Sequence, residues 1–125
     1  MTSEHKKVLL LIKAVIFNYH GLDEEEKKIL EKTAQEIDGH EELKWVNEFI
    51  AQDHFSSFDR SRGFFNSVLQ NLDNATKLSF LVQAWDANLV KGYVSEIEAT
   101  SLLKLAKDWN IQSDFITFVR SRRQS

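Results

Sequence analysis

Apolar side chains recur every three or four positions along most of the chain. Leu78, Leu81, Val82, Trp85 and Leu89 form one such series, spaced as on one face of an α-helix. No stretch of strict apolar–polar alternation is long enough for a β-strand. The chain has no proline and only four glycines, so ring-enforced breaks and strand-type turn chemistry are missing. The sequence therefore predicts an all-α fold.

Seven helices are predicted, in a single compact domain that covers residues 1–125. Capping boxes mark two helix starts, Asp23 with Glu26 and Ser95 with Glu98. In each, the side chain of one residue bonds the main-chain amide of the other. Gly39 is expected at C′, just after the end of a helix. The predicted helices cover residues 3–19, 23–38, 41–53, 60–72, 74–90, 95–109 and 113–122.

The two halves of the chain align when one is shifted by 72 positions. Asp23 then falls on Ser95 and Glu26 on Glu98. Each half contains an apolar helix, a turn, a capped helix and a short third helix. One interpretation is an internal duplication, and the other is that any two capped amphipathic helices align this well. The bundle is therefore expected to contain two pseudo-repeated halves if the first interpretation holds.

Composition and charge narrow the class of protein. Hydrophobic residues make up 42% and charged residues 28%, with a net charge of −3, which is typical of a globular domain and argues against nucleic-acid binding. The absence of cysteine excludes disulfides, thiolate zinc sites and a thiol nucleophile. The longest apolar stretch begins at Val8 and has about half the roughly 20 residues that span a bilayer. The expected location is the cytoplasm.

The turn before each capping box resembles the signature of the TerB-like family, named for bacterial tellurite-resistance proteins. That signature has the form Asp-Gly-Glu-(Ile/Val)-(Ser/Asp)-x-x-Glu between two helices. Here the second copy reads KGYVSEIE, from Lys91 to Glu98, and the first reads YHGLDEEE, from Tyr19 to Glu26. The acidic motif is degenerate, because its leading Asp is Tyr19 in one copy and Lys91 in the other.

The resemblance implies a small non-enzymatic bacterial protein, a stress-associated module that acts by protein–protein interaction. The family also occurs in membrane-linked co-chaperones, which implies a protein partner in the cytoplasm or in a peripheral membrane-associated complex. The family's acidic positions imply a weak divalent-cation site, and Glu26 and Glu98 match them. With Asp86 they are our predicted metal ligands, and an all-oxygen set favours magnesium or calcium. No other cofactor is expected.

The second turn also has the spacing of the end of an EF-hand loop. With Gly92 at position 6 of the loop, Glu98 falls at position 12, where the bidentate ligand belongs. Positions 1, 3 and 5 cannot bind a hard cation, because they are Ala87, Leu89 and Lys91. The favoured interpretation is a turn that starts the next helix.

A weak cation site at the same turn stays open as an alternative. Asp86 and Asn88 are one residue out of register with the EF-hand pattern, as if the loop had gained a residue. Either could share a cation with Glu96 or Glu98.

No residues are predicted to be catalytic. Four histidines are present without an HExxH pattern, and no glycine-rich phosphate loop occurs. Ser56 and Ser57 are close to His54 and Asp59 in the sequence, but proximity along the chain does not establish a triad.

Two regions are candidates for partner binding. The segment 56–59 is expected to be a connector between the halves, and its rings, with those that follow, either fill the core or line a partner groove. These are Phe55, Phe58, Phe64 and Phe65. The terminal cluster Arg120, Arg122 and Arg123 suits either a solvated last turn or an acidic partner.

A second functional class is a stand-alone regulator or immunity-type inhibitor. It would bind a basic partner through an acidic helical face, steered by charge. The residues of that face are Asp23, Glu24, Glu25, Glu26, Glu36, Glu41 and Glu42.

Overall fold

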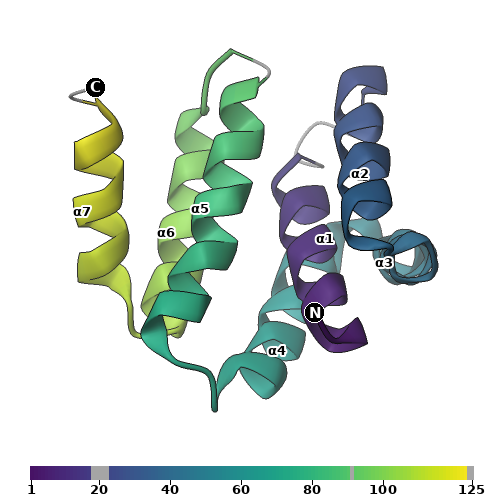
Figure 1. Cartoon of the computed structure of the whole chain (residues 1–125), viewed down its shortest axis with the longest axis horizontal. Coiled ribbons are helices and arrows are strands. Elements are labelled where there is room, and N and C mark those ends of the chain that lie inside the picture. Colours follow the sequence, from purple (N-terminus) through teal and green to yellow (C-terminus); the bar gives the residue numbers. More distant parts are fainter. Residues whose placement is uncertain (18–22, 91, 124–125) are drawn as a thin grey trace.

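The fold is all-α, as predicted (Figure 1). The computed structural model describes residues 1–17, 23–90 and 92–123, and no strand occurs within these ranges. None of the helices found there is long and apolar enough to cross a membrane. The elements are α1 (Ser3–Phe17), α2 (Glu24–Ile37), α3 (His40–Gln52), the 3-10 turn η2 (His54–Ser56), α4 (Ser57–Leu69), α5 (Asn74–Val90), α6 (Glu96–Asp108) and α7 (Gln112–Arg123).

The helices form two three-helix units that repeat along the chain. Shifted by 72 positions, α1, α2 and α3 coincide with α5, α6 and α7 to within one residue at each end. The three helices of each unit contact one another. Figure 1 shows the first unit on the right, the second on the left and α4 below, between them. This correspondence favours the interpretation of the sequence as an internal duplication.

Both predicted capping boxes are present. The Asp23 carboxylate accepts a hydrogen bond from the Glu26 amide at 2.7 Å, and the Glu26 carboxylate accepts from the Asp23 amide at 3.2 Å. At the start of α6 the Ser95 hydroxyl accepts from the Glu98 amide at 3.2 Å, and Glu98 accepts from the Ser95 amide at 2.9 Å. Both glutamates are buried. Equivalent side chains therefore start the second helix of each unit.

The ends of these two helices also correspond, and they correct the prediction for Gly39. The left-handed residues are Asp38, with φ 55°, and Asn110, with φ 59°. The residue that follows each of them donates its amide to a carbonyl in the last turn of the helix. Gly39 donates to Ala34 at 2.8 Å, and Ile111 donates to Ala106 at 2.9 Å. This is the Schellman arrangement. Gly39 therefore follows the C′ residue, since Asp tolerates the left-handed conformation.

A requirement for space explains glycine at position 39. A Cβ atom there would lie 3.1 Å from Cγ1 of Ile37 and 3.4 Å from Cδ1 of Leu10. Leu10 belongs to α1 and is fully buried. The glycine therefore lets the link between α2 and α3 approach α1 closely.

The predicted connector 56–59 is largely helical, and α4 begins at Ser57 instead of residue 60. Asp53 accepts the Phe55 amide at 3.2 Å and starts η2. The Arg60 guanidinium donates to the carbonyls of Phe49 and Asp53, each at 2.8 Å. These bonds fold the chain back at the end of α3 and hold α4 against it.

The core is built around α1. Every residue from Val8 to Phe17 is buried except Lys13, and α1 contacts each of α2, α3, α4, α5 and α6. From α4, Phe65 reaches the same core and meets the Trp109 ring edge-on, with centroids 5.7 Å apart. One apolar core therefore joins the two units and α4.

Candidate functional site

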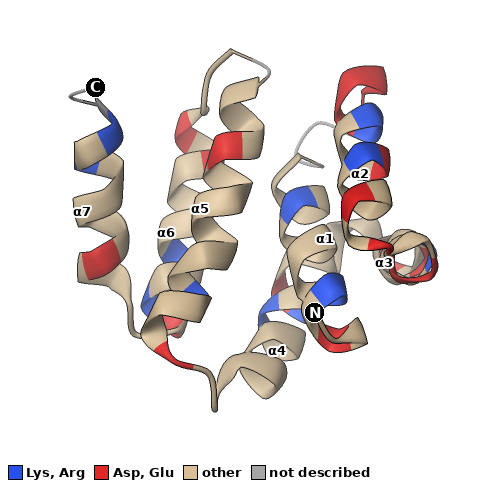
Figure 2. Ribbon diagram, viewed as in Figure 1, with Lys and Arg blue, Asp and Glu red and all other residues tan. Residues whose placement is uncertain are grey.

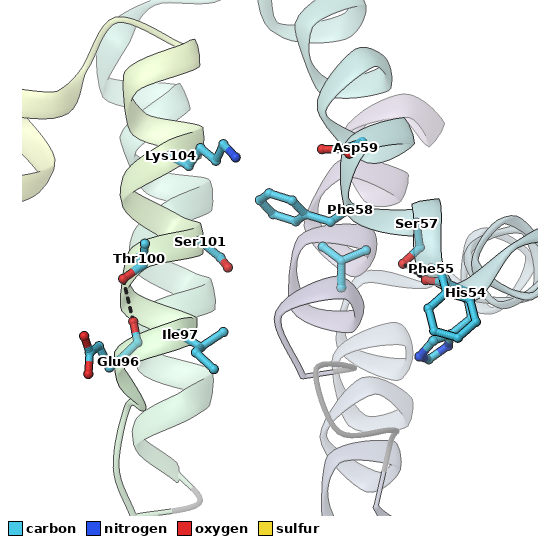
Figure 3. Close-up of a pocket in the computed structure, with 11 residues that line it drawn as sticks. His54, Phe55, Ser57, Phe58, Asp59, Glu96, Ile97, Thr100, Ser101 and Lys104 are labelled. Carbon is cyan, nitrogen blue, oxygen red and sulfur yellow. Dashed lines mark hydrogen bonds between the residues drawn. The ribbon is translucent and has the colours of Figure 1, made fainter.

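A groove lies between the start of α4 and one face of α6 (Figure 3). Its volume is 600 Å³, within the range of ligand and peptide sites. The η2 turn forms part of one wall, and Val15 of α1 also lines the groove. The groove therefore depends on α4, the one helix that has no counterpart in the repeat.

The groove exposes apolar side chains on both walls. Phe55 is 98% exposed and Ile97 is 41% exposed. Figure 3 shows Phe58 and Ile97 pointing from opposite walls into the space between α4 and α6. Phe64 and Phe65 instead pack in or against the core. Core packing is confirmed for Phe65, with Phe58 and Phe64 packed against the core, whereas Phe55 and Phe58 line a groove whose partner stays a prediction.

Charged residues lie at both ends of the groove. Glu96 lies at the end near Ile97, whereas Lys104 and Asp59 lie at the other end (Figure 3). Between them the Thr100 hydroxyl donates to the Glu96 carbonyl at 2.7 Å. Figure 3 shows the Glu96 carboxylate on the side of α6 that faces away from α4, so the charged groups that an elongated guest would meet are Lys104 and Asp59, at one end.

The α6 wall of the groove was not predicted, although the sequence carried a signal for it. Ile97 occupies the position that corresponds to Glu25 in the first unit, and Thr100 that of Lys28. An exposed charged face in one unit is thus replaced by an apolar and hydroxyl face in the other. Aligning the halves position by position would have revealed it.

A bidentate ion pair lies one turn beyond the groove on both helices. The Arg62 guanidinium donates to the Asp108 carboxylate at 2.7 and 2.9 Å. These hydrogen bonds raise the pKa of Arg62 above its ordinary value. Such a planar pair fixes distance and orientation together. It therefore holds the middle of α4 to the end of α6, one turn beyond the groove residues Asp59 and Lys104.

The hydroxyl groups of the groove do not form an activated nucleophile with their nearest neighbours. The Ser57 hydroxyl donates to the His54 main-chain carbonyl at 2.9 Å. This bond uses the proton that a general base would have to withdraw. Asp59 lies 3.6 Å from the Arg62 guanidinium. His54 and Ser57 therefore bond each other at the start of α4, whereas Asp59 pairs with Arg62.

The predicted metal ligands have other structural roles. Glu26 and Glu98 each accept a cap amide, and Asp86 forms a salt bridge with Arg122 at 3.1 Å. Within the described ranges, no three His, Asp or Glu side chains gather as a cation site. The motif residues Tyr19, His20, Gly21 and Lys91, and the predicted helix end 18–19, lie outside the described residues. Metal binding stays a prediction.

A melting curve with magnesium, calcium and a chelator tests the metal prediction. A cation held by Glu98 is expected to raise the melting temperature, because it stabilises only the folded state. Glu98→Gln keeps the capping geometry and removes the charge, so it is expected to abolish the shift. An unchanged melting temperature with both cations would exclude the site.

The predicted acidic face is interrupted by lysines. Figure 2 shows red and blue residues alternating along α2, and Glu24 pairs with Lys27 at 3.6 Å. Glu26 is buried, so it is not part of an exposed face. A hydrogen bond from the Ser3 hydroxyl lowers the pKa of Glu42. The first unit thus presents a mixed surface, with no continuous acidic one among its described residues.

No family model matches the chain, and neither a curated protein nor a solved structure does so. The likeness to TerB-like proteins thus rests on the turn motifs and on the helical architecture. The groove and its exposed rings provide further grounds for a functional proposal.

Proposed function

We propose that this protein is a non-enzymatic interaction module that binds a segment of a protein partner in the groove between α4 and α6. The observation that carries the proposal is the Phe55 ring, 98% exposed at the edge of a groove. Aromatic side chains are enriched at the centres of protein interfaces. A partner that covers both the exposed ring and the apolar groove removes the largest apolar area from water, which favours binding.

The charges of the groove indicate the chemistry of the partner segment. Its centre would be a bulky apolar side chain, placed between Phe58 and Ile97. An acidic residue on one side of it would reach Lys104. Such complementarity favours one direction of binding over the reverse.

The TerB-like resemblance supports the same class of function. It adds the expectation of a stress-associated, cytoplasmic bacterial protein whose action is binding and not turnover. The resemblance lies in the turns that start α2 and α6, and the groove is formed by α4 together with α6. Glu96 and Ile97 belong both to the second turn motif and to the groove, so the two lines of support meet at the start of α6.

Peptide display against the purified protein tests the groove. We expect the enriched peptides to share a bulky apolar residue with an acidic residue on one side of it. Ile97→Glu introduces the residue of the first unit, Glu25, and is expected to weaken binding of these peptides at least about tenfold, through burial of an unpaired charge. Calorimetry with synthetic peptides measures the change.

Leu89→Glu is the matched control, since Leu89 is 45% exposed and does not line the groove. It is expected to leave the affinity unchanged. Peptides that bind the wild type and the Ile97→Glu variant equally would contradict the proposal, as would a selection that enriches no common apolar residue.

A further inference from the structure

A second pocket, separate from the groove, lies among the three helices of the second unit. Its volume is 210 Å³. It has no lining residue in common with the groove. In Figure 1, α7 is at the edge of the molecule farthest from α2 and α3. The main lining residues are Trp85, Leu103, Phe115, Ile116, Val119 and Arg120.

The internal repeat shows that the fold does not require these apolar residues. At corresponding positions the first unit is almost entirely polar, and only the counterpart of Phe115 is a buried apolar residue. The same three-helix framework therefore folds with a charged surface here. An apolar pocket in one unit alone indicates binding. The corresponding residues of the first unit are Lys13, Glu31, Leu43, Lys44, Asn47 and Glu48.

Two polar groups of the residues that line the pocket have no partner among the described residues. Arg120 forms no ion pair within the part of the chain that the structure describes. By contrast its neighbour Arg122 pairs with Asp86 at 3.1 Å. The Trp85 side chain is 9% exposed, and its indole N–H has no acceptor among the described residues. The pocket therefore offers a cation beside apolar walls.

The rings of the pocket favour an aromatic guest. Trp85 and Phe115 meet edge-on, with centroids 6.0 Å apart and planes at 79°, a geometry that a third ring can extend. An engineered cavity of about 150 Å³ holds benzene. The larger volume here leaves room for a ring with a short side chain.

We propose that the pocket formed by α5, α6 and α7 binds a small aromatic carboxylate. The ring lies against Trp85 and Phe115, and the carboxylate pairs with the Arg120 guanidinium. A carboxylate is the anion whose two oxygens match the fork of a guanidinium. This site and its ligand are independent of the peptide groove.

Titration with 3-phenylpropionate, followed by amide NMR shifts, tests the proposal. We expect saturable shifts in α5, α6 and α7 with a dissociation constant on the order of 1 mM, typical for a ligand of this size. The neutral amide 3-phenylpropionamide is expected to bind about tenfold more weakly, because it lacks the charge-assisted pair. Arg120→Gln is expected to weaken the acid by the same factor and to leave the amide unaffected.

Ile116→Lys places in the pocket the residue type of the corresponding position in the first unit, Lys44. It is expected to abolish binding. Val119→Asn does the same at a second position, should the lysine disturb folding. Ile97→Glu, in the separate groove, is the matched control and is expected to bind 3-phenylpropionate as the wild type does. Equal affinity for acid and amide, shifts confined to the α4–α6 groove, or no saturable shift would each overturn the proposal.

Discussion

Replacing Phe65 by alanine is expected to lower the free energy of unfolding by about 3–5 kcal/mol. Phe65 is 0% exposed and packs edge-on against Trp109. It connects α4, the helix without a counterpart, to the end of α6. Removing the ring leaves a cavity at the place where the two units and α4 share one core. Urea or thermal unfolding measures the change.

Phe55→Ala is the matched control, because it makes the same chemical change at a side chain that is 98% exposed. Its effect is expected to stay within about 0.5 kcal/mol. A loss of less than about 1 kcal/mol for Phe65→Ala would contradict the described core. A comparable loss for both variants would contradict the exposure of Phe55.

Leu30→Ala and Leu102→Ala are expected to lower the free energy of unfolding by similar amounts, each about 2–5 kcal/mol. The two leucines correspond in the repeat and are 2% and 0% exposed. Each lies on the capped second helix of its unit. If the units are equivalent, the cavities that these substitutions create have similar surroundings. Denaturant unfolding of the two variants, compared side by side, measures this.

Leu89→Ala is the control for this pair, since Leu89 is 45% exposed and its truncation removes little buried surface. A large cost at one leucine with less than about 1 kcal/mol at the other would show that the two units are not packed equivalently.

The helices were predictable because apolar spacing and caps are local properties of the sequence. The Asp23 and Ser95 caps and the bounds of α5 agree with the prediction. The start of α4 was predicted three residues late, because it depends on the bonds of Arg60 to the end of α3. Contacts between a side chain and a distant carbonyl leave no periodic signal.

The candidate groove was predictable only on one side. The rings around Phe55 and Phe58 stood out by composition, whereas Ile97 stands out only when the two halves are aligned, because it replaces Glu25 of the first unit. Which helix faces α4 is decided by packing around α1. The sequence did carry a signal for the pocket, because Trp85 stands where the first half of the chain has Lys13. That this position is buried is evident only in the folded chain.

The bidentate ion pair between Arg62 and Asp108 limits how the α4–α6 groove can change its width. It fastens the two helices one turn beyond the groove at the end marked by Lys104 and Asp59. The opposite end is lined by Phe55 and Ile97, whose apolar side chains cannot form such a pair. If the groove widens, α4 and α6 therefore rotate about the Arg62–Asp108 ion pair. Their separation then increases most at the end with Phe55 and Ile97, where the apolar side chain of the partner enters.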